Sequence, residues 1–160
     1  MQKIHPYLWF DDQAEAAMDF YCSVFRNARK GKVSRFPDGS PGGTAGKVMT
    51  AEFELEGMHV TALNGGPHFR FTEAISLYVD CADQAEVDYY WERLTADGGA
   101  ESMCGWLKDK YGLSWQIVPR RLMELLGDED RAVAGRATTA MLQMRKIVVA
   151  DLERAAAGEG

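Results

Sequence analysis

The hydrophobic pattern of the chain contains one arrangement twice, a short alternating segment followed by a helical stripe. Residues 3–10 and 75–81 alternate between two parities, as the side chains of a strand do. After each segment, apolar residues recur at i, i+3, i+4 and i+7, namely Ala17, Phe20, Tyr21 and Val24, and then Val87, Tyr90, Trp91 and Leu94. Each half is therefore predicted to begin with a strand and an amphipathic helix. Asp11 or Asp12 is the expected N-cap of the first helix, and Asp83 that of the second.

The two strand-to-helix junctions are also similar in sequence. A shift of 71 residues places Ile4 on Ile75 and Tyr7 on Tyr78, and it places the run Asp-Gln-Ala-Glu at 12–15 on the same run at 83–86. These six identities indicate that the chain contains an internal duplication.

Three more strands are predicted in the first half, over residues 32–36, 47–56 and 58–63. Residues 38–46, DGSPGGTAG, form a Gly- and Pro-rich loop of the kind that lies at the surface and often folds over a binding site. The second Gly- and Pro-containing segment, NGGPHFRF, is interpreted as the linker between the halves.

In the second half, residues 104–119, CGWLKDKYGLSWQIVP, predict two strands that meet at a tight turn. Alternation puts Ser114 and Gln116 on the face opposite Trp115, while Trp106 is assigned to neither face. From Arg120 onward the composition favours helices alone. A short helix that ends at Gly127 is predicted from Leu122, Leu125 and Leu126, and a longer one from Val133, Ala137, Ala140, Met141 and Met144. We predict an α+β fold in a single domain, with module one at 1–64, a linker at 65–72, module two at 73–119 and a helical tail at 120–160.

Charge and composition exclude several classes of protein. The formal net charge is −6 and no long basic cluster is present, which argues against a nucleic-acid partner. No apolar run approaches the roughly 20 residues that span a bilayer, and the first residues lack the apolar segment of a secretory signal. We therefore expect a cytoplasmic protein that neither crosses nor binds a membrane. Its three cysteines are expected to be reduced thiols.

Several motifs together resemble one family. They are LNGGPHFRF, the strand from Ser76 to Cys81, Trp91, the pair Gly98–Gly99, and CGWLKDKYGLSWQIVP. The chain resembles the PhnB-like family, labelled 3-demethylubiquinone-9 3-methyltransferase, of the vicinal oxygen chelate superfamily. The resemblance implies the glyoxalase/bleomycin resistance/dioxygenase fold, in which two βαβββ modules curl a mixed sheet around a cleft. It also implies a homodimer.

Enzymes of that superfamily bind a divalent metal through one side chain on each of four strands. The resemblance places His5 at one position, Gln116 at another and Ala74 at a third, while His59 or Thr61 can be aligned with the fourth. A catalytic divalent site needs about three His, Asp or Glu ligands, and no carboxylate is present here. We therefore predict no cofactor and keep a divalent metal as the less favoured alternative, for which His5, His59 and Gln116 are the candidate ligands.

The methyltransferase label finds no support in the residues. A Gly-rich turn for a nucleotide-like methyl donor would follow the first strand, but Asp-Asp-Gln follows Phe10 instead. The sequence NGGP at Asn64 precedes a strand rather than opening a helix. Methyl transfer is accordingly the third of three functional hypotheses.

The first hypothesis is that the protein binds a small, partly apolar organic molecule in a metal-free or metal-degenerate cleft. The second is a metal-dependent enzyme of glyoxalase or dioxygenase type with a nonstandard site. Cys104, beside Gly105 and near Lys108 and Lys110, is a candidate reactive thiol. Catalytic residues and the identity of the ligand stay open. The predicted cleft combines aromatic and neutral polar side chains: His5, Tyr7, Trp9, Asn64, Phe69, Ser76, Tyr78, Ser114 and Gln116.

Overall fold

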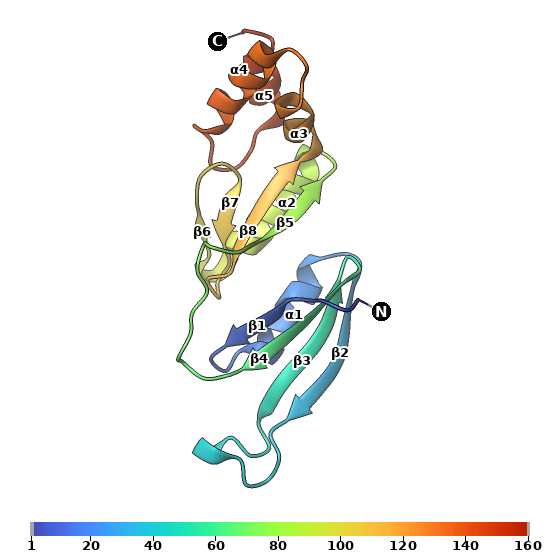
Figure 1. Ribbon diagram of the computed structural model, residues 1–160, viewed down its shortest axis with the longest axis vertical. Helices are drawn as coiled ribbons and strands as arrows, with labels where there is room; N and C mark the ends of the chain where they lie inside the picture. Colours follow the sequence, from blue (N-terminus) through green and yellow to red (C-terminus); the bar gives the residue numbers. More distant parts are fainter. Residues whose placement is uncertain (1, 160) are drawn as a thin grey trace. The chain divides into compact units, whose positions relative to one another are not determined.

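The computed structural model describes residues 2–159 and divides into two compact units, Met1–Phe71 and Thr72–Gly160 (Figure 1). The division falls at the end of the predicted linker. Most of that linker belongs to the first unit, because the Trp9 indole donates a hydrogen bond to the Gly66 carbonyl and the rings of Phe10 and Phe71 lie 5.2 Å apart. The two units are described separately below.

The first unit is a four-stranded sheet with one helix on one face. Its sheet order is β1-β4-β3-β2, and only the β1–β4 pair is parallel. The loop between β2 and β3 contains a short 3-10 turn at Pro41–Gly43. The elements, in chain order, are β1 (Tyr7–Phe10), α1 (Ala14–Val24), β2 (Ala28–Arg35), β3 (Val48–Leu55) and β4 (Met58–Asn64).

The first strand is shorter than predicted, because it starts at Tyr7 rather than at residue 3. Pro6 has no N–H to give to a sheet, although its carbonyl still accepts a hydrogen bond from the Thr61 amide at 3.1 Å. Leu8 and Phe10 are buried on the face of the sheet that carries α1. His5, Tyr7 and Trp9 share the opposite parity, as expected.

The second unit begins with the same topology, which confirms the predicted α+β architecture of two similar modules. Its sheet order is β5-β8-β7-β6, again with one parallel pair, β5–β8. The buried residues of its first helix are the predicted stripe, Val87, Tyr90, Trp91 and Leu94. The elements of this module are β5 (Ser76–Cys81), α2 (Gln84–Thr95), a 3-10 turn (Ala96–Gly98), β6 (Ala100–Glu101), β7 (Trp106–Lys108) and β8 (Ser114–Pro119).

Strand register defines which residues are equivalent in the two modules. Tyr7 pairs with Thr61 in the first sheet, and Tyr78 pairs with Gln116 in the second. Thr61 and Gln116 are therefore equivalent, and the shift of 71 residues makes Ser76 the counterpart of His5. Ala74 lies before β5, so the alignment that put Ala74 at this position is wrong by two residues.

The helices α1 and α2 start differently, and one predicted cap is wrong. The N-cap of α1 is Gln13 without a side-chain hydrogen bond, and Asn64 Oδ1 accepts instead from the Ala14 amide at 2.8 Å. Asp83 caps α2 as predicted and accepts from the Glu86 amide at 3.0 Å. Asn64 ends β4, whereas the equivalent end of β8 is a proline, which offers no side-chain acceptor.

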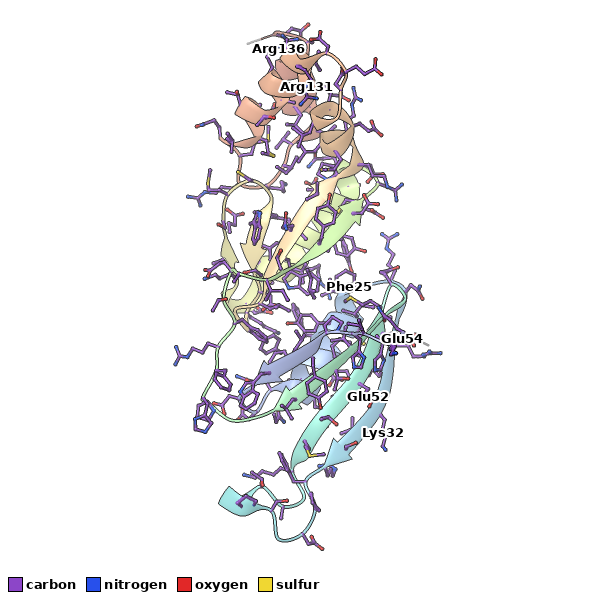
Figure 2. All side chains as sticks on the ribbon, viewed as in Figure 1. Phe25, Lys32, Glu52, Glu54, Arg131 and Arg136 are labelled. Atoms are coloured by element: carbon purple, nitrogen blue, oxygen red, sulfur yellow. The ribbon has the colours of Figure 1, made fainter. Side chains whose placement is uncertain are left out.

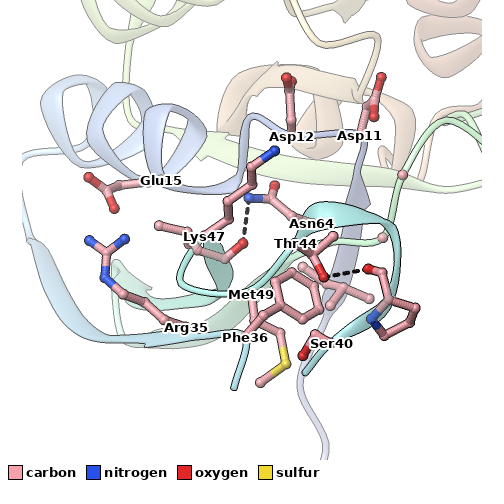
Figure 3. Close-up of a pocket in the computed structure, with 15 residues that line it drawn as sticks. Asp11, Asp12, Glu15, Arg35, Phe36, Ser40, Thr44, Lys47, Met49 and Asn64 are labelled. Carbon is pink, nitrogen blue, oxygen red and sulfur yellow. Dashed lines mark hydrogen bonds between the residues drawn. The ribbon is translucent and has the colours of Figure 1, made fainter. Parts of the chain in front are cut away.

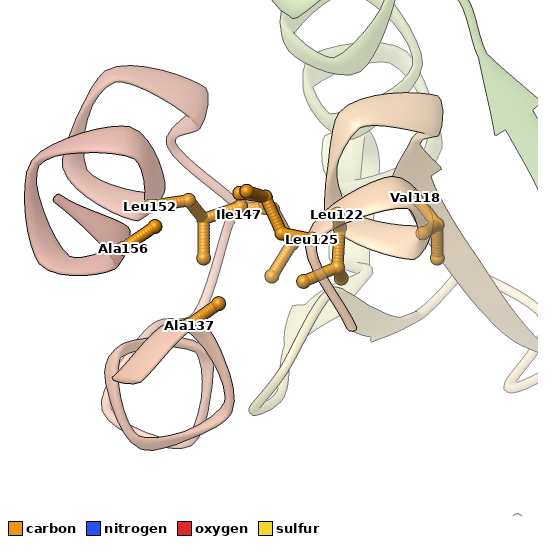
Figure 4. Packing of buried hydrophobic residues seen from close by; sticks show 7 residues of the cluster. All are labelled: Val118, Leu122, Leu125, Ala137, Ile147, Leu152 and Ala156. Atoms are coloured by element: carbon orange, nitrogen blue, oxygen red, sulfur yellow. The ribbon is translucent and has the colours of Figure 1, made fainter. Parts of the chain in front are cut away.

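Three helices follow β8: α3 (Arg120–Leu126), α4 (Arg131–Met141) and α5 (Val149–Ala156). The first two were predicted and the third was not. They pack on the second module through one apolar cluster, drawn in Figure 4, formed by Val118, Leu122, Leu125, Ala137, Ile147, Leu152 and Ala156. Within residues 2–159, no helix has the length and apolar character needed to cross a membrane.

Gln84 of α2 anchors the chain segment that enters α5. Its side-chain amide donates to the Ile147 carbonyl at 3.0 Å, and its carbonyl oxygen accepts from the Val149 amide at 2.8 Å. Lys146 adds an ion pair to Asp88 at 2.8 Å. The helical tail is thus an integral part of the second unit.

Candidate functional site

Three of the predicted cleft residues lie along the open face of the first sheet, opposite α1. His5 Nε2 and Thr61 Oγ1 form a hydrogen bond of 3.1 Å, and the His5 ring meets the His59 ring edge-on at a centroid distance of 4.5 Å. Tyr7 is 58% exposed on the same face. The parity argument thus correctly grouped His5, Tyr7 and Trp9.

An aromatic pair borders this face. The Trp9 ring lies 4.9 Å from the ring of Phe69, which is otherwise largely exposed, and the Trp9 indole is fixed by its 2.9 Å hydrogen bond to the Gly66 carbonyl. Gly65 is required here, because a Cβ at this residue would lie only 2.3 Å from Trp9 Cε2. The linker therefore contributes Phe69 to the wall beside Trp9.

Asn64 lies on the other face of the sheet. It pairs with Phe10 in the β1–β4 register, and both ends of its side-chain amide are engaged, one with Ala14 and the other with the Val48 carbonyl at 3.0 Å. The structure therefore separates Asn64 from His5 and Trp9. Its side chain holds the start of α1 against the sheet.

Two glutamates on β3 share the open face and were not predicted. Glu52 is paired with Thr61, and Glu54 is paired with His59 (Figure 2). Glu54 also forms a 2.9 Å ion pair with Arg29. The alternation of glutamates with apolar residues in AEFELE is the signal that could have placed both on this face.

In the second sheet, the predicted cleft residues of β5 and β8 do lie together. Gln116 Nε2 donates to Ser76 Oγ at 2.9 Å, and Ser76 and Ser114 are paired across the strands. Ser114 is buried, and its hydroxyl has no hydrogen-bond partner among the described residues. Tyr78 is half exposed, and its partial burial, followed by the charge of Asp80, raises its pKa.

Strand pairing adds Trp106 and Lys108 to this open face. Trp106 is paired with Gln116 and Lys108 with Ser114, so both have the parity of the predicted residues. Alternation on either side of Leu107, which is paired with the buried Trp115, is the signal that could have identified them. Lys108 forms an ion pair with Glu73.

The two lysines considered as activators of the Cys104 thiol have other partners. Lys108 is paired with Glu73, and Lys110 lies over the Tyr111 ring. The Cys104 backbone has a positive φ of 59° and its amide donates to the Met144 carbonyl at 2.8 Å. These contacts describe a residue that shapes the loop before β7.

The four equivalent positions do not fit a divalent metal. They hold one imidazole (His5), two hydroxyls (Thr61 and Ser76) and one amide (Gln116), without a carboxylate or thiolate. The side chains are already hydrogen-bonded in pairs within each sheet. Zinc and other catalytic divalent ions require about three strong His, Asp, Glu or Cys donors. Among residues 2–159, no three such side chains are grouped closely enough to hold an ion.

A separate pocket of about 970 Å³ lies in the first unit, at the end of the sheet where β1 and β4 finish (Figure 3). One wall is the start of α1 and the other is the loop between β2 and β3. The Gly- and Pro-rich composition of that loop predicts that it folds over a site, but the charged residues of this pocket are not among the predicted site residues. They are Asp11, Asp12, Glu15, Arg35 and Lys47.

The repeated modules and their shared register define an α+β protein of the glyoxalase/bleomycin resistance type. Residues 2–118 match the family model described as 3-demethylubiquinone-9 3-methyltransferase, and the chain belongs to this family. It is similar to a PhnB protein from Bacillus cereus that carries the same description, at 37% identity and a TM-score of 0.66, over 74% of this chain and 99% of the other.

Two more distant structures share the fold. Protein PA1353 from Pseudomonas aeruginosa is 20% identical with a TM-score of 0.62, over 74% of this chain and 98% of its own. The fosfomycin resistance protein FosX from Mesorhizobium loti is 19% identical with a TM-score of 0.50, over 72% of this chain and 90% of its own. No curated protein matches the chain.

Proposed function

We propose that this protein binds a small, partly apolar organic molecule on its open sheet faces without the help of a divalent metal. The observation that carries the proposal is that the side chains at the four equivalent positions include no carboxylate and no thiolate. His5 is bonded to Thr61, and Gln116 to Ser76. All four groups can orient an organic ligand through hydrogen bonds, whereas only His5 among them is a strong donor to a dication.

The surroundings of these pairs support a ligand of mixed polarity. Trp9 and Phe69 in the first unit, and Trp106 and Tyr78 in the second, offer aromatic surface. The buried Ser114 hydroxyl lacks a partner among the described residues, and a ligand that supplied a hydrogen bond there would remove the cost of leaving it unpaired. We propose further that the protein is a cytoplasmic homodimer.

The alternative is a metal-dependent enzyme with a nonstandard site. The observation that favours it is the 4.5 Å contact of the His5 and His59 rings on a face that also carries Glu52. Methyl transfer, the activity named in the family description, has no comparable support. Both α1 and α2 begin without the Gly-rich turn that cradles a nucleotide.

Metal analysis of protein purified without chelator separates the first two functions. We expect far less than one zinc, nickel, manganese or iron per chain. Stoichiometric metal that disappears in His5→Ala would overturn the metal-free proposal and establish the alternative.

Thermal shift measurements against a panel of small organic molecules test ligand binding itself, because a ligand that binds only the native state raises its stability. A compound that raises the melting temperature of the wild type should have no effect on Gln116→Leu. Gln13→Leu is the control, since Gln13 is exposed. If no compound stabilises the wild type, the proposed function fails.

A further inference from the structure

The pocket between α1 and the β2–β3 loop carries charges of both signs that remain unpaired. Within the described chain, the carboxylates of Asp11, Asp12 and Glu15 form neither a hydrogen bond nor an ion pair, and neither does the ammonium of Lys47. All four side chains line the pocket (Figure 3). All four side chains are exposed to solvent, and together they place charges of both signs around one cavity.

The second module shows what the equivalent acids do when they serve the fold. Asp83 accepts from the Glu86 amide at 3.0 Å, and Glu86 Oε2 accepts from the Ala82 amide at 2.7 Å, so both carboxylates fix the start of α2. Their counterparts in the first module are Asp12 and Glu15. Because Asn64 caps α1 from β4, these two acids are not needed to start the helix.

The loop that forms the opposite wall is also specific to the first module. Residues 36–47 connect β2 to β3, whereas only residues 102–105 connect β6 to β7. The long loop is closed at its base by hydrogen bonds of 2.9 Å from Phe36 to Lys47 and from Gly46 to Phe36. Arg35 donates to the Gly46 carbonyl at 3.1 Å. Both modules therefore have a strand-to-helix junction, but only the first has the long loop that forms the opposite wall of the pocket.

The arrangement of charge and apolar surface defines the ligand. In Figure 3, the Lys47 side chain extends toward Asp12 and the Arg35 guanidinium faces Glu15. Phe36, Met49 and Leu63 add apolar surface to the pocket lining. A simple anion would meet three carboxylates, and a simple cation would leave Lys47 without a partner.

We infer that this pocket binds a small zwitterionic molecule, with an amino group at Asp11 and Asp12, an acidic group at Lys47 and Arg35, and an apolar segment between them. Its volume of about 970 Å³ is large enough to admit such a ligand. The site is independent of the function proposed for the open sheet faces, because it lies at the end of the first sheet and uses other residues.

The test uses three matched probes and the full chain: 6-aminohexanoate, hexylamine and hexanoate, titrated separately and followed by NMR chemical shifts. We expect 6-aminohexanoate to bind about tenfold more tightly than either singly charged probe, because only it carries both an ammonium group for the aspartates and a carboxylate for Lys47 and Arg35. Equal affinity for all three probes, tighter binding of a singly charged probe, or no binding of any of them would overturn the inference.

Two variants and a control locate the site. Asp12→Asn and Lys47→Met should each weaken 6-aminohexanoate binding about tenfold. Asp83→Asn, the matched change in the second module, should leave this affinity unchanged. The melting temperature should be the same for wild type, Asp12→Asn and Lys47→Met. If both pocket variants instead lose stability together, Lys47 and Asp12 pair with each other in solution, and the inference is wrong.

Discussion

The start of α2 depends on Asp83, whereas the start of α1 depends on Asn64 rather than on Asp12. We expect Asp83→Ala to lower the free energy of unfolding by about 1 kcal/mol, the usual cost of a lost N-cap. The matched change Asp12→Ala should stay within about 0.5 kcal/mol of wild type, as for an exposed side chain without a partner. Urea denaturation followed by circular dichroism measures both. Equal losses in the two variants would contradict this account of capping.

Cys81 is fully buried at the end of β5, and this burial raises the pKa of its thiol to about 12 from an ordinary value of 9.0. The unfolded chain therefore releases the thiol proton at lower pH than the folded chain does. Below pH 9 the thiol is neutral in both states, and above it stability falls as the pH rises toward 12.

Comparison of wild type with Cys81→Ala isolates this contribution. The variant loses packing, so its free energy of unfolding at pH 8 is lower than that of wild type. Between pH 9 and 10, the free energy of unfolding of wild type should fall by about 1 kcal/mol more than that of the variant. Urea denaturation at each pH measures the difference. A constant difference across this range would show that the thiol does not titrate as described.

At the residue scale, the face of the sheet on which a strand residue lies was predictable, whereas the partner of its side chain was not. Alternation grouped His5 with Trp9, because that requires only local sequence. Asn64 was placed on the wrong face, since its role depends on β4 lying beside the start of α1. Trp106 could not be placed until the β7–β8 register was known.

At the element scale, the turn between β7 and β8 is built around the buried carboxylate of Asp109. One oxygen accepts from the amides of Tyr111 and Leu113 at 2.8 and 3.1 Å, and the other from the Trp115 indole at 2.9 Å. Asp109→Ala leaves these donors without that acceptor and should lower the free energy of unfolding by about 3 kcal/mol. Chemical denaturation measures it, with the exposed Asp38→Ala as control. Similar stability of the two variants would contradict the proposed role.

The helical tail is held to α2 by Gln84, and this contact has an internal control. Gln84→Ala removes the hydrogen bonds to Ile147 and Val149 and should cost about 2 kcal/mol. Gln13, its counterpart in the first module, is exposed, so Gln13→Ala should have little effect. Limited proteolysis reports the same difference, as earlier cleavage within residues 142–149 of Gln84→Ala. Identical cleavage of both variants would show that Gln84 does not anchor the tail.

Elements with a long periodic pattern were predictable, and short ones were not. The stripes of α1 and α2 extend over about three turns, and α3 ends at Gly127 as expected. The strand β6 has only two residues and therefore no alternation. Helix α5 has eight residues, about two turns, so its apolar pattern repeats too few times to mark a helix.

At the scale of the whole molecule, large apolar side chains remain at the surface. Among residues 2–159 they include Tyr7 and Tyr78 on the open sheet faces, and Met123 and Leu142 in the tail. A second copy of the chain would bury some of this surface. We expect light scattering at micromolar concentration to give about twice the chain mass of 17.8 kDa, as for a dimer with an interface of about 1,600 Å². The mass of a single chain would contradict the homodimer.

The sequence separation of the paired strands affects how quickly each module can form. Tyr7 and Thr61 pair across 54 residues in the first module, and Ser76 and Ser114 across 38 in the second. Closing the longer segment costs only about 0.3 kcal/mol more, because the entropy of closure grows with the logarithm of length. The pocket loop at residues 36–47 should therefore slow the folding of its module less than about twofold. The length of this loop is therefore only weakly constrained by the folding of its module.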